Sequence, residues 1–208
     1  MEDVNILAIN PGSTSTKIAV YCNTKSIFLK TIRHNAEELS HYRRIADQFE
    51  FRREIILKEL QEAEIDVSKI TAVVGRGGLI KPIESGVYYV NSRMKTDLMN
   101  CIRGEHASNL GALIADDIAS TLPYAKAFIA DPVVVDEMQE VARLTGHPKF
   151  ERVSIFHALN QKAIARQYAK TLDKKYEELN VIVAHLGGGI SVGAHCKGRV
   201  IDVNNALD

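Results

Sequence analysis

The sequence has no excess of charge of either sign, few cysteines and no long hydrophobic run. Lysine plus arginine number 26 and aspartate plus glutamate also number 26, so no bulk field favours nucleic acid or an anionic membrane surface. The three cysteines are far apart and form no CxxC pair, which argues against a disulfide framework and a zinc site. The N-terminus is acidic where a signal peptide needs basic residues. We therefore expect a cytoplasmic protein with no nucleic-acid or membrane partner.

A pattern near the N-terminus occurs again near the end of the chain. Residues 5–25 read NILAINPGSTSTKIAVYCNTK, which is an apolar strand, a Gly/Ser/Thr loop and an alternating strand. Residues 180–200 read NVIVAHLGGGISVGAHCKGRV, and a shift of 175 positions aligns Gly12 with Gly187. Self-similarity at one fixed offset indicates a duplication. Two such loops facing each other across a cleft would hold a polyphosphate between two related domains.

The spacing of apolar residues predicts alternating strands and helices. Strands at 17–22 and 26–31 follow the first strand, and a charged helical segment covers 37–63, where the pattern is compatible with a break near 48–51. The remaining expected elements are strands at 70–74, 86–90, 125–130 and 199–204, and helices at 93–102, 106–121, 136–144 and 158–172. This order favours an α/β fold built from two related domains.

The domain pattern is uneven along the chain. We expect a complete N-terminal domain over 1–150 and the beginning of a second domain over 151–208, because the second strand–loop–strand is followed by only one further strand. A complete partner domain needs on the order of 100 to 200 residues. The sequence is therefore expected to be the N-terminal part of a longer protein.

Both loops carry residue types that suit a phosphate ligand. Each loop enters a strand, whereas a P-loop or a dinucleotide fingerprint opens a helix. Gly12 permits a tight turn, Ser13 and Ser15 carry hydroxyl donors, and Lys17 adds a positive charge. A Ser/Thr-rich hairpin turn is the alternative for the first loop alone. Three consecutive glycines at 187–189 favour a closely approaching ligand at the second loop.

Five further residues are candidates for a site between the loops. Arg76 lies among glycines at a strand end, where it suits bidentate contact with a carboxylate or a phosphoryl group; the alternative is a surface arginine. Asp131 follows a strand at the sheet edge where α/β ligands bind, and with Asn10 it offers oxygen ligands to Mg²⁺. A turn cap is the alternative for Asp131. His106 and His157 lie at expected helix starts, where capping or packing is the commoner role.

Six motifs in order carry a resemblance to a known family. They are ILAINPGSTSTKIAVY at 6–21, VVGRGGLIKPI at 73–83, GEHASNLGA at 104–112, ADPVVVDEM at 130–138, FHALNQKA at 156–163 and HLGGGISV at 185–192. Together they resemble the acetate and butyrate kinase family of the actin, Hsp70 and sugar kinase superfamily. The fourth and fifth motifs follow the butyrate pattern and depart from the acetate pattern. The resemblance implies the ribonuclease H-like fold of that superfamily.

The resemblance implies a reversible, Mg-ATP-dependent phosphorylation of butyrate to butanoyl phosphate and ADP, which yields ATP in fermentation. A carboxylate is already ionised at neutral pH, so positioning and electrostatic stabilisation carry the catalysis and no general base is needed. Acetate, propionate and branched acids stay open as substrates, because one methylene changes binding by only ~1 to 3 kcal/mol. An actin-like or Hsp70-like ATPase module and a sugar kinase are further alternatives.

The resemblance also implies roles for single residues. Arg76 and His157 contact the moving phosphoryl group, and His106 supports the acyl site. Asn10 and Asp131 organise Mg²⁺. The residues implied in binding ATP or ADP are Ser13, Ser15, Lys17, His185, Gly187, Gly188 and Gly189. A second catalytic arginine and most of the adenosine pocket are expected beyond residue 208, so the chain alone is expected to be inactive; the complete protein is expected to form homo-oligomers.

Overall fold

The computed structural model describes residues 3–204, which divide into two compact units that are treated separately. The first unit runs to Ile80 and includes Val87–Ala130, and the second comprises Lys81–Gly86 and the chain from Asp131 onwards. The chain passes from the first unit to the second at Asp131, whereas the sequence predicted a boundary at 150/151. Residues 131–150 group with the second unit because they pack on its last strand; there the Gln139 N–H donates to the Ile201 carbonyl at 3.0 Å. The extent of the related domains stays a prediction.

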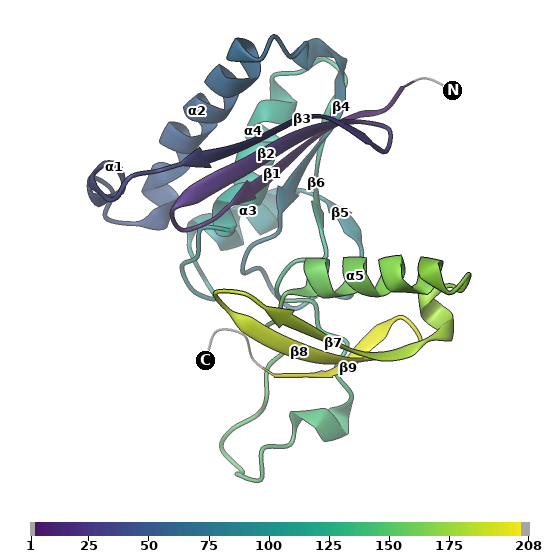
Figure 1. The fold of residues 1–208 in the computed structure, drawn as a ribbon. Helices are drawn as coiled ribbons and strands as arrows, with labels where there is room; N and C mark the ends of the chain where they lie inside the picture. The colour runs from purple at the N-terminus through teal and green to yellow at the C-terminus, as the bar shows by residue number, and fades with distance from the viewer. Residues whose placement is uncertain (1–2, 205–208) are drawn as a thin grey trace. The chain divides into compact units, whose positions relative to one another are not determined.

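The first unit is built on a six-stranded sheet (Figure 1). Its strands are β1 (Asn5–Pro11), β2 (Ser15–Cys22), β3 (Lys25–Arg33), β4 (Ile70–Arg76), β5 (Val87–Tyr89) and β6 (Lys126–Ala130), in the spatial order β3-β2-β1-β4-β6-β5. The first three strands are antiparallel neighbours, whereas β1, β4 and β6 are parallel and are joined through helices. The expected hairpin start and the strands that follow it are confirmed.

The helices of the first unit are α1 (Ala36–Ser40), the 3-10 turn η1 (Ile45–Gln48), α2 (Phe49–Glu62), the 3-10 turn η2 (Val67–Lys69), α3 (Ser92–Met99) and α4 (Asn109–Ser120). The helical segment expected over 37–63 is interrupted at 41–44, and the break allowed near 48–51 coincides with the change from η1 to α2. The chain leaves the helical conformation before η1 because Arg44 is extended, and its N–H donates to the Asp47 carboxylate at 3.1 Å. Asn91 caps α3 by accepting from the Met94 N–H at 3.0 Å.

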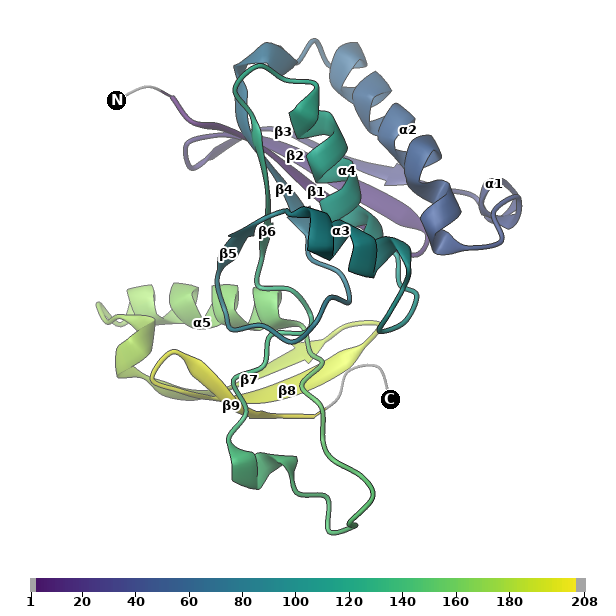
Figure 2. The ribbon, with the colours of Figure 1, turned by 180° about the vertical axis from the view of Figure 1, so that it is seen from behind.

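Helix α4 packs closely against the sheet in the first unit. It lies over β4 and β6, and most of its residues are buried (Figure 2). The backbones of β4 and α4 nearly touch at Gly75 and Gly111. A Cβ on Gly75 would overlap the carbonyl group of Gly111, and a Cβ on Gly111 would overlap the carbonyl group of Arg76. The glycines therefore let the helix start close to the end of the strand that carries Arg76.

Gly75→Ala is expected to lower the unfolding free energy of the first unit by about 3 kcal/mol, because backbone atoms cannot move aside as a flexible side chain can. Urea denaturation followed by circular dichroism measures the change. Gly188→Ala is the matched control, because among residues 3–204 no atom beyond the two chain neighbours lies within 4 Å of the Cβ position there. Equal midpoints for the two variants would contradict the close packing of β4 on α4.

The second unit is a three-stranded sheet with one long helix. It contains the 3-10 turn η3 (Glu140–Arg143), α5 (Ala158–Thr171), the 3-10 turn η4 (Tyr176–Glu178), β7 (Asn180–Leu186), β8 (Ile190–Cys196) and β9 (Arg199–Val203). The strands and α5 are as expected, whereas the helix over 136–144 is wrong. Arg143 reaches back to the Asp136 carboxylate at 2.9 and 3.0 Å, and Val135 bridges to Ile83. These contacts hold the segment largely extended, with only a single 3-10 turn.

The second hairpin repeats the first with one residue fewer in its loop. In the first hairpin Asn5 lies opposite Cys22, and in the second Asn180 lies opposite Cys196. The offset of 175 therefore holds for the first strand and becomes 174 after the loop. A single shortened loop accounts for this difference, so the fixed offset assumed from the sequence is wrong for the second and third strands.

Two local irregularities recur at equivalent positions of the repeat. The ladder register shifts between Val20 and Tyr21 in the first unit and between Ala194 and His195 in the second. A residue with positive φ follows at each turn, at Asn23 and Lys197 with φ of 55° and 48°. Bulges and turns of this kind are specific features of a fold. Their recurrence supports the duplication more strongly than the similarity of sequence does.

The two sheets differ in which face is covered. On the β7–β8 face away from α5, Ile182, Leu186 and Ile190 are 77%, 77% and 56% exposed. At the equivalent positions of the first unit, Leu7 and Thr16 are 0% exposed, on a sheet that α2 and α4 cover. Sequence repetition thus does not bring repetition of the helical layer. Within residues 3–204, no helix is long and apolar enough to cross a lipid bilayer.

Candidate functional site

A buried arginine holds the first loop from inside the first unit. Arg52 on α2 is 0% exposed, and its guanidinium donates to the carbonyl oxygens of Gly12 at 2.8 Å, Ser13 at 3.3 Å and Ser15 at 3.3 Å. Gln48 accepts from the same guanidinium at 2.8 and 3.0 Å. Burial lowers the pKa of Arg52 to about 10. The loop carbonyls are therefore satisfied from within, while the Ser13 side chain is exposed.

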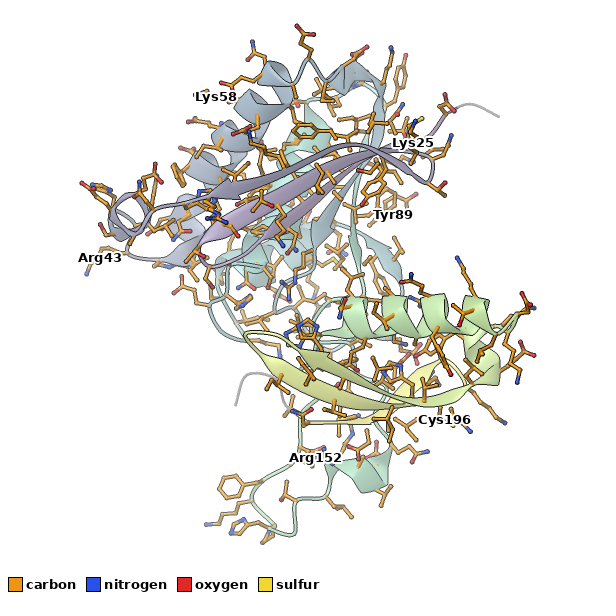
Figure 3. All side chains as sticks on the ribbon, viewed as in Figure 1. Lys25, Arg43, Lys58, Tyr89, Arg152 and Cys196 are labelled. Atoms are coloured by element: carbon orange, nitrogen blue, oxygen red, sulfur yellow. The ribbon has the colours of Figure 1, made fainter. Side chains whose placement is uncertain are left out.

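Replacing Arg52 by methionine is expected to loosen the first loop and to lower the unfolding free energy by about 3 kcal/mol, because three loop carbonyl groups lose the buried guanidinium that donates to them. Hydrogen exchange of the loop amides should accelerate as well. Lys58→Met is the control: Lys58 extends into solvent from the same helix (Figure 3). If both variants exchange their loop amides at the wild-type rate, Arg52 does not hold the loop.

Three of the predicted site residues come together in the first unit. Arg76 is the last residue of β4, and its guanidinium donates to the Asn10 side-chain oxygen at 3.4 Å. Within residues 3–204, no carboxylate forms an ion pair with Arg76. Burial lowers the pKa of Arg76. A partly buried guanidinium without a carboxylate partner is suited to an anionic ligand. Lys17 lies opposite Asn10 on β2 and is exposed.

His106 was expected at the start of a helix. It lies three residues before α4, so this expectation is wrong. Its Nδ1 accepts from the Ser108 backbone N–H at 3.1 Å and lies 2.7 Å from the Ser108 hydroxyl. A backbone N–H can only donate, so the proton of the neutral ring is on Nε2. Burial, and next the charge of Arg76, lower the pKa of His106. His106 is therefore a neutral donor beside the charged guanidinium.

Asp131 follows β6 and belongs to the second unit. It is 6% exposed, and its Oδ1 accepts from the Ser85 hydroxyl at 2.6 Å and from the Gly86 N–H at 2.9 Å. Its Oδ2 lies 3.4 Å from an Arg166 nitrogen. The backbone φ of Asp131 is +36°, an unfavourable value for an aspartate that the surrounding hydrogen bonds maintain. Asn10 belongs to the first unit, so the expected pairing of the two residues stays a prediction.

His157 and His185 stack in the second unit. Their ring centroids are 3.7 Å apart and the rings are 5° from parallel, and Asn160 on α5 lies 2.9 Å from His185 Nδ1. A Cβ on Gly187 would lie 2.8 Å from His185 Nε2, so the first loop glycine makes room for the ring. Gly188 has no such neighbour within 4 Å. The second loop thus needs one of its glycines for internal packing.

Behind His157 lies a row of buried side chains, here termed the His157 network. Its members are Ser191, Gln161, His195 and Tyr176, which are 0 to 3% exposed. The Ser191 hydroxyl lies 2.7 Å from His157 Nδ1, Gln161 lies 2.8 Å from Ser191 and 3.0 Å from His195, and the Tyr176 hydroxyl lies 2.6 Å from His195. Sequence reasoning missed this network. The sequence signal was the pair of polar residues, Ser191 and His195, alternating along a strand with Gly193.

Burial, and next the charge of Lys162, lower the pKa of His195 to about 4. The unfolded chain binds this proton near pH 6.5, so stability is expected to fall as the pH drops from about 7 towards 4, by at most ~1.4 kcal/mol per pH unit for this group. His195→Gln should reduce the slope of unfolding free energy against pH, measured by urea denaturation. The exposed His147→Gln is the control. Parallel slopes for wild type and His195→Gln would contradict the prediction.

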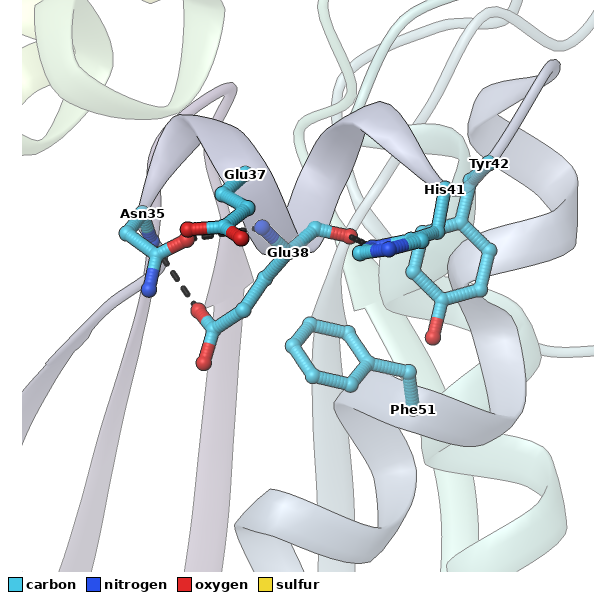
Figure 4. Close-up of a pocket in the computed structure, with 6 residues that line it drawn as sticks. All are labelled: Asn35, Glu37, Glu38, His41, Tyr42 and Phe51. Carbon is cyan, nitrogen blue, oxygen red and sulfur yellow. Dashed lines mark hydrogen bonds between the residues drawn. The ribbon is translucent and has the colours of Figure 1, made fainter.

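A surface hollow in the first unit lies apart from the predicted site residues (Figure 4). It has a volume of about 310 Å³, and the residues that line it are Asn35, Glu37, Glu38, His41, Tyr42 and Phe51. Two of these residues are carboxylates, and one of them completes a capping box with Asn35 at the start of α1. An anionic ligand would be repelled there by the two carboxylates.

A magnesium ion is compatible with the residues present. Among residues 3–204, no group of three or more histidine, cysteine, aspartate or glutamate side chains can hold a metal ion. Mg²⁺ needs no such cluster, because it keeps several waters and binds through one or two carboxylates beside substrate phosphates. The Asp131 carboxylate supplies one such group, and among the described residues its Oδ2 has one hydrogen bond, a long one from Arg166.

The sequence matches a known family and two named relatives. Residues 150–207 match the acetokinase family. The chain is 60% identical over 203 residues to Butyrate kinase 1 of Clostridium acetobutylicum and 58% identical to Butyrate kinase 2 of the same organism. Each alignment covers 98% of this chain and 57% of the relative. The chain therefore spans a little more than half the length of these curated relatives.

Solved structures share the fold. An acetate kinase of Porphyromonas gingivalis matches with a TM-score of 0.71 and 18% identity, and a propionate kinase of Francisella tularensis with 0.66 and 21%. Both alignments cover 98% of this chain and 58% of the solved chain. At such identities the likeness concerns the fold alone. It confirms the expected α/β fold.

Proposed function

We propose that this chain, a homologue of the butyrate kinases in the acetokinase family, serves in the reversible phosphorylation of butyrate by MgATP, which forms butanoyl phosphate and ADP. The 60% identity to Butyrate kinase 1 carries the proposal. It favours an acyl kinase over an actin-like or Hsp70-like ATPase module and over a sugar kinase. The complete protein is proposed to be cytoplasmic, to act in the fermentation of short-chain fatty acids and to form homo-oligomers.

The first unit supplies the acyl side of the proposed site. Arg76 binds the carboxylate and then the moving phosphoryl group, which its lack of an ion-pair partner among residues 3–204 supports. His106 donates from Nε2 to the same anions while staying neutral. A neutral donor beside a guanidinium adds a hydrogen bond without adding repulsion between two cations.

The two loops supply the phosphate side of the proposed site. Ser13, Ser15 and Lys17 contact the terminal phosphates from the first loop, whose carbonyl groups Arg52 keeps turned inward. The second loop contributes Gly188, Gly189 and the ring of His185 beside Gly187. Asp131 and Asn10 are the residues that would hold Mg²⁺, which would neutralise phosphate charge.

Butyrate is the proposed acid, with acetate, propionate and branched acids as the alternatives to be tested. A pocket for an acyl chain discriminates by only ~1 to 3 kcal/mol per methylene. The fold likeness to an acetate kinase and a propionate kinase is neutral on this point. A panel of straight and branched acids is therefore part of the experiment.

Fusing residues 1–208 to the remaining segment of Butyrate kinase 1 of Clostridium acetobutylicum provides a complete protein for assay. With ATP, magnesium and butyrate, trapping by hydroxylamine should yield butanoyl hydroxamate. Arg76→Ala should lower kcat by about 10²-fold or more, because transition-state charge loses its partner. Arg93→Ala is the control, since Arg93 is exposed.

The 208-residue chain assayed alone is expected to yield no hydroxamate. Acid-independent ATP hydrolysis by the fusion would point to an ATPase module and overturn the proposal. Unchanged kinetics in Arg76→Ala would reject the role of Arg76 and leave the reaction itself intact.

A further inference from the structure

We propose that Ser191 and Gln161 are positioning residues that hold His157 in the tautomer with its proton on Nε2, and so decide which ring nitrogen donates. Only the group to which His157 donates, the phosphoryl group, rests on the proposed function. The tautomer follows from the donors and acceptors of the second unit, beginning with two main-chain groups that have a fixed role.

The first fixed group is the carbonyl of Ser191. It lies 3.1 Å from the Gln161 amide nitrogen. A carbonyl oxygen can only accept, so the NH₂ group of Gln161 must face β8. The amide oxygen of Gln161 then faces His195 Nε2 at 3.0 Å. The orientation of this amide is thereby assigned without reference to His157.

The second fixed group is the backbone N–H of His157, which donates to the Ser191 hydroxyl oxygen at 3.3 Å. The same oxygen accepts from the Gln161 NH₂ group at 2.8 Å. A hydroxyl oxygen has two lone pairs, and both are now used. Its own proton therefore goes to the remaining neighbour, His157 Nδ1, at 2.7 Å. Because Nδ1 accepts, the neutral His157 ring carries its proton on Nε2.

The far end of the network agrees with this direction. The Gln161 oxygen needs a donor, which His195 supplies from Nε2, and His195 Nδ1 then accepts from the Tyr176 hydroxyl at 2.6 Å. Burial lowers the pKa of His195 and raises that of Tyr176, so both groups are neutral, as this pattern requires. Every hydrogen bond between side chains from Tyr176 to His157 thus points the same way.

Gly193 makes room for this arrangement. A Cβ there would overlap the Gln161 amide oxygen and would lie 3.1 Å from His195 Nε2. The last glycine of HLGGGISVG therefore serves the His157 network and not a phosphate. Stacking of His157 on His185 restrains the plane of the ring, so the tautomer also sets the direction in which Nε2 donates.

Long-range ¹H–¹⁵N correlation spectra of the histidine-labelled 208-residue chain test the tautomer directly. His157, assigned by its loss in His157→Gln, should show an unprotonated Nδ1 and a protonated Nε2. In Ser191→Ala the ratio of the Nε2–H to the Nδ1–H form should fall by roughly 3- to 10-fold, the effect of one hydrogen bond. Ser154→Ala is the control: it removes another buried hydroxyl of the same unit, which donates to the Val135 carbonyl at 2.7 Å.

A wild-type His157 protonated on Nδ1 overturns the proposal, as does an unchanged ratio in a folded Ser191→Ala; if that variant does not fold, the wild-type spectrum alone decides. In the fusion enzyme, Ser191→Ala should lower kcat with little change in KM, and should have no further effect in a His157→Gln background. Additive losses would overturn the positioning role. Failure of the fusion to make butanoyl phosphate would leave the spectra interpretable, so the two proposals fail separately.

Discussion

The structure depends on one constraint, which is that a tight hairpin loop satisfies only one of its carbonyl groups with its own N–H, so that further carbonyl groups at the loop take a donor from a neighbouring helix. In the first unit the donor is the guanidinium of Arg52, with bonds to Gly12, Ser13 and Ser15. In the second unit, Gln161 of α5 donates to the Ser191 carbonyl just after the loop. Each unit therefore joins its loop to a helix through buried polar contacts, which are costly to break because the groups left behind are buried.

The two hairpins of the repeat have helices packed on opposite faces. The repeat is faithful down to its bulge and its positive-φ turn residue, yet α2 and α4 cover one face of the first sheet and α5 covers the other face of the second. Hydrogen bonding within a hairpin is local and is inherited with its sequence. The packing of a sheet face depends on the segments around it, so Leu7 is fully buried whereas its counterpart Ile182 is exposed.

The chain has no net charge, but both units place positive or hydrogen-bond-donating groups where an anion could bind. The chain carries equal numbers of acidic and basic side chains, so attraction of an anion is local. Arg76 provides a positive charge, and His106 donates a hydrogen bond without adding charge, since burial lowers its pKa. The Ser191 hydroxyl at His157 Nδ1 leaves Nε2 as the donor of the His157 ring. In the proposed reaction the obstacle is repulsion between anions, and such donors reduce it.

Local pattern predicted most elements correctly, and it failed where distant groups decide the conformation. The helix expected over 136–144 has the right residues for a helix, but the Arg143–Asp136 contacts and the bridge to Ile83 hold it largely extended, with one 3-10 turn. Arg52 was missed because an arginine on a helix is usually a surface residue. Its place in the apolar stripe with Phe49 and Ile56 was the available sign.

The sequence by itself determined the duplication, the succession of strands along the chain and the residue types of the two loops, because periodicity and turn chemistry are properties of short segments. Only the tertiary structure decided the tautomers of His106 and His157, the inward turn of the first loop on Arg52 and the use of Gly75, Gly187 and Gly193 as spacers. These features depend on which donor meets which acceptor across the fold. These hydrogen bonds and close contacts form between residues far apart in sequence, so a local sequence pattern does not predict them.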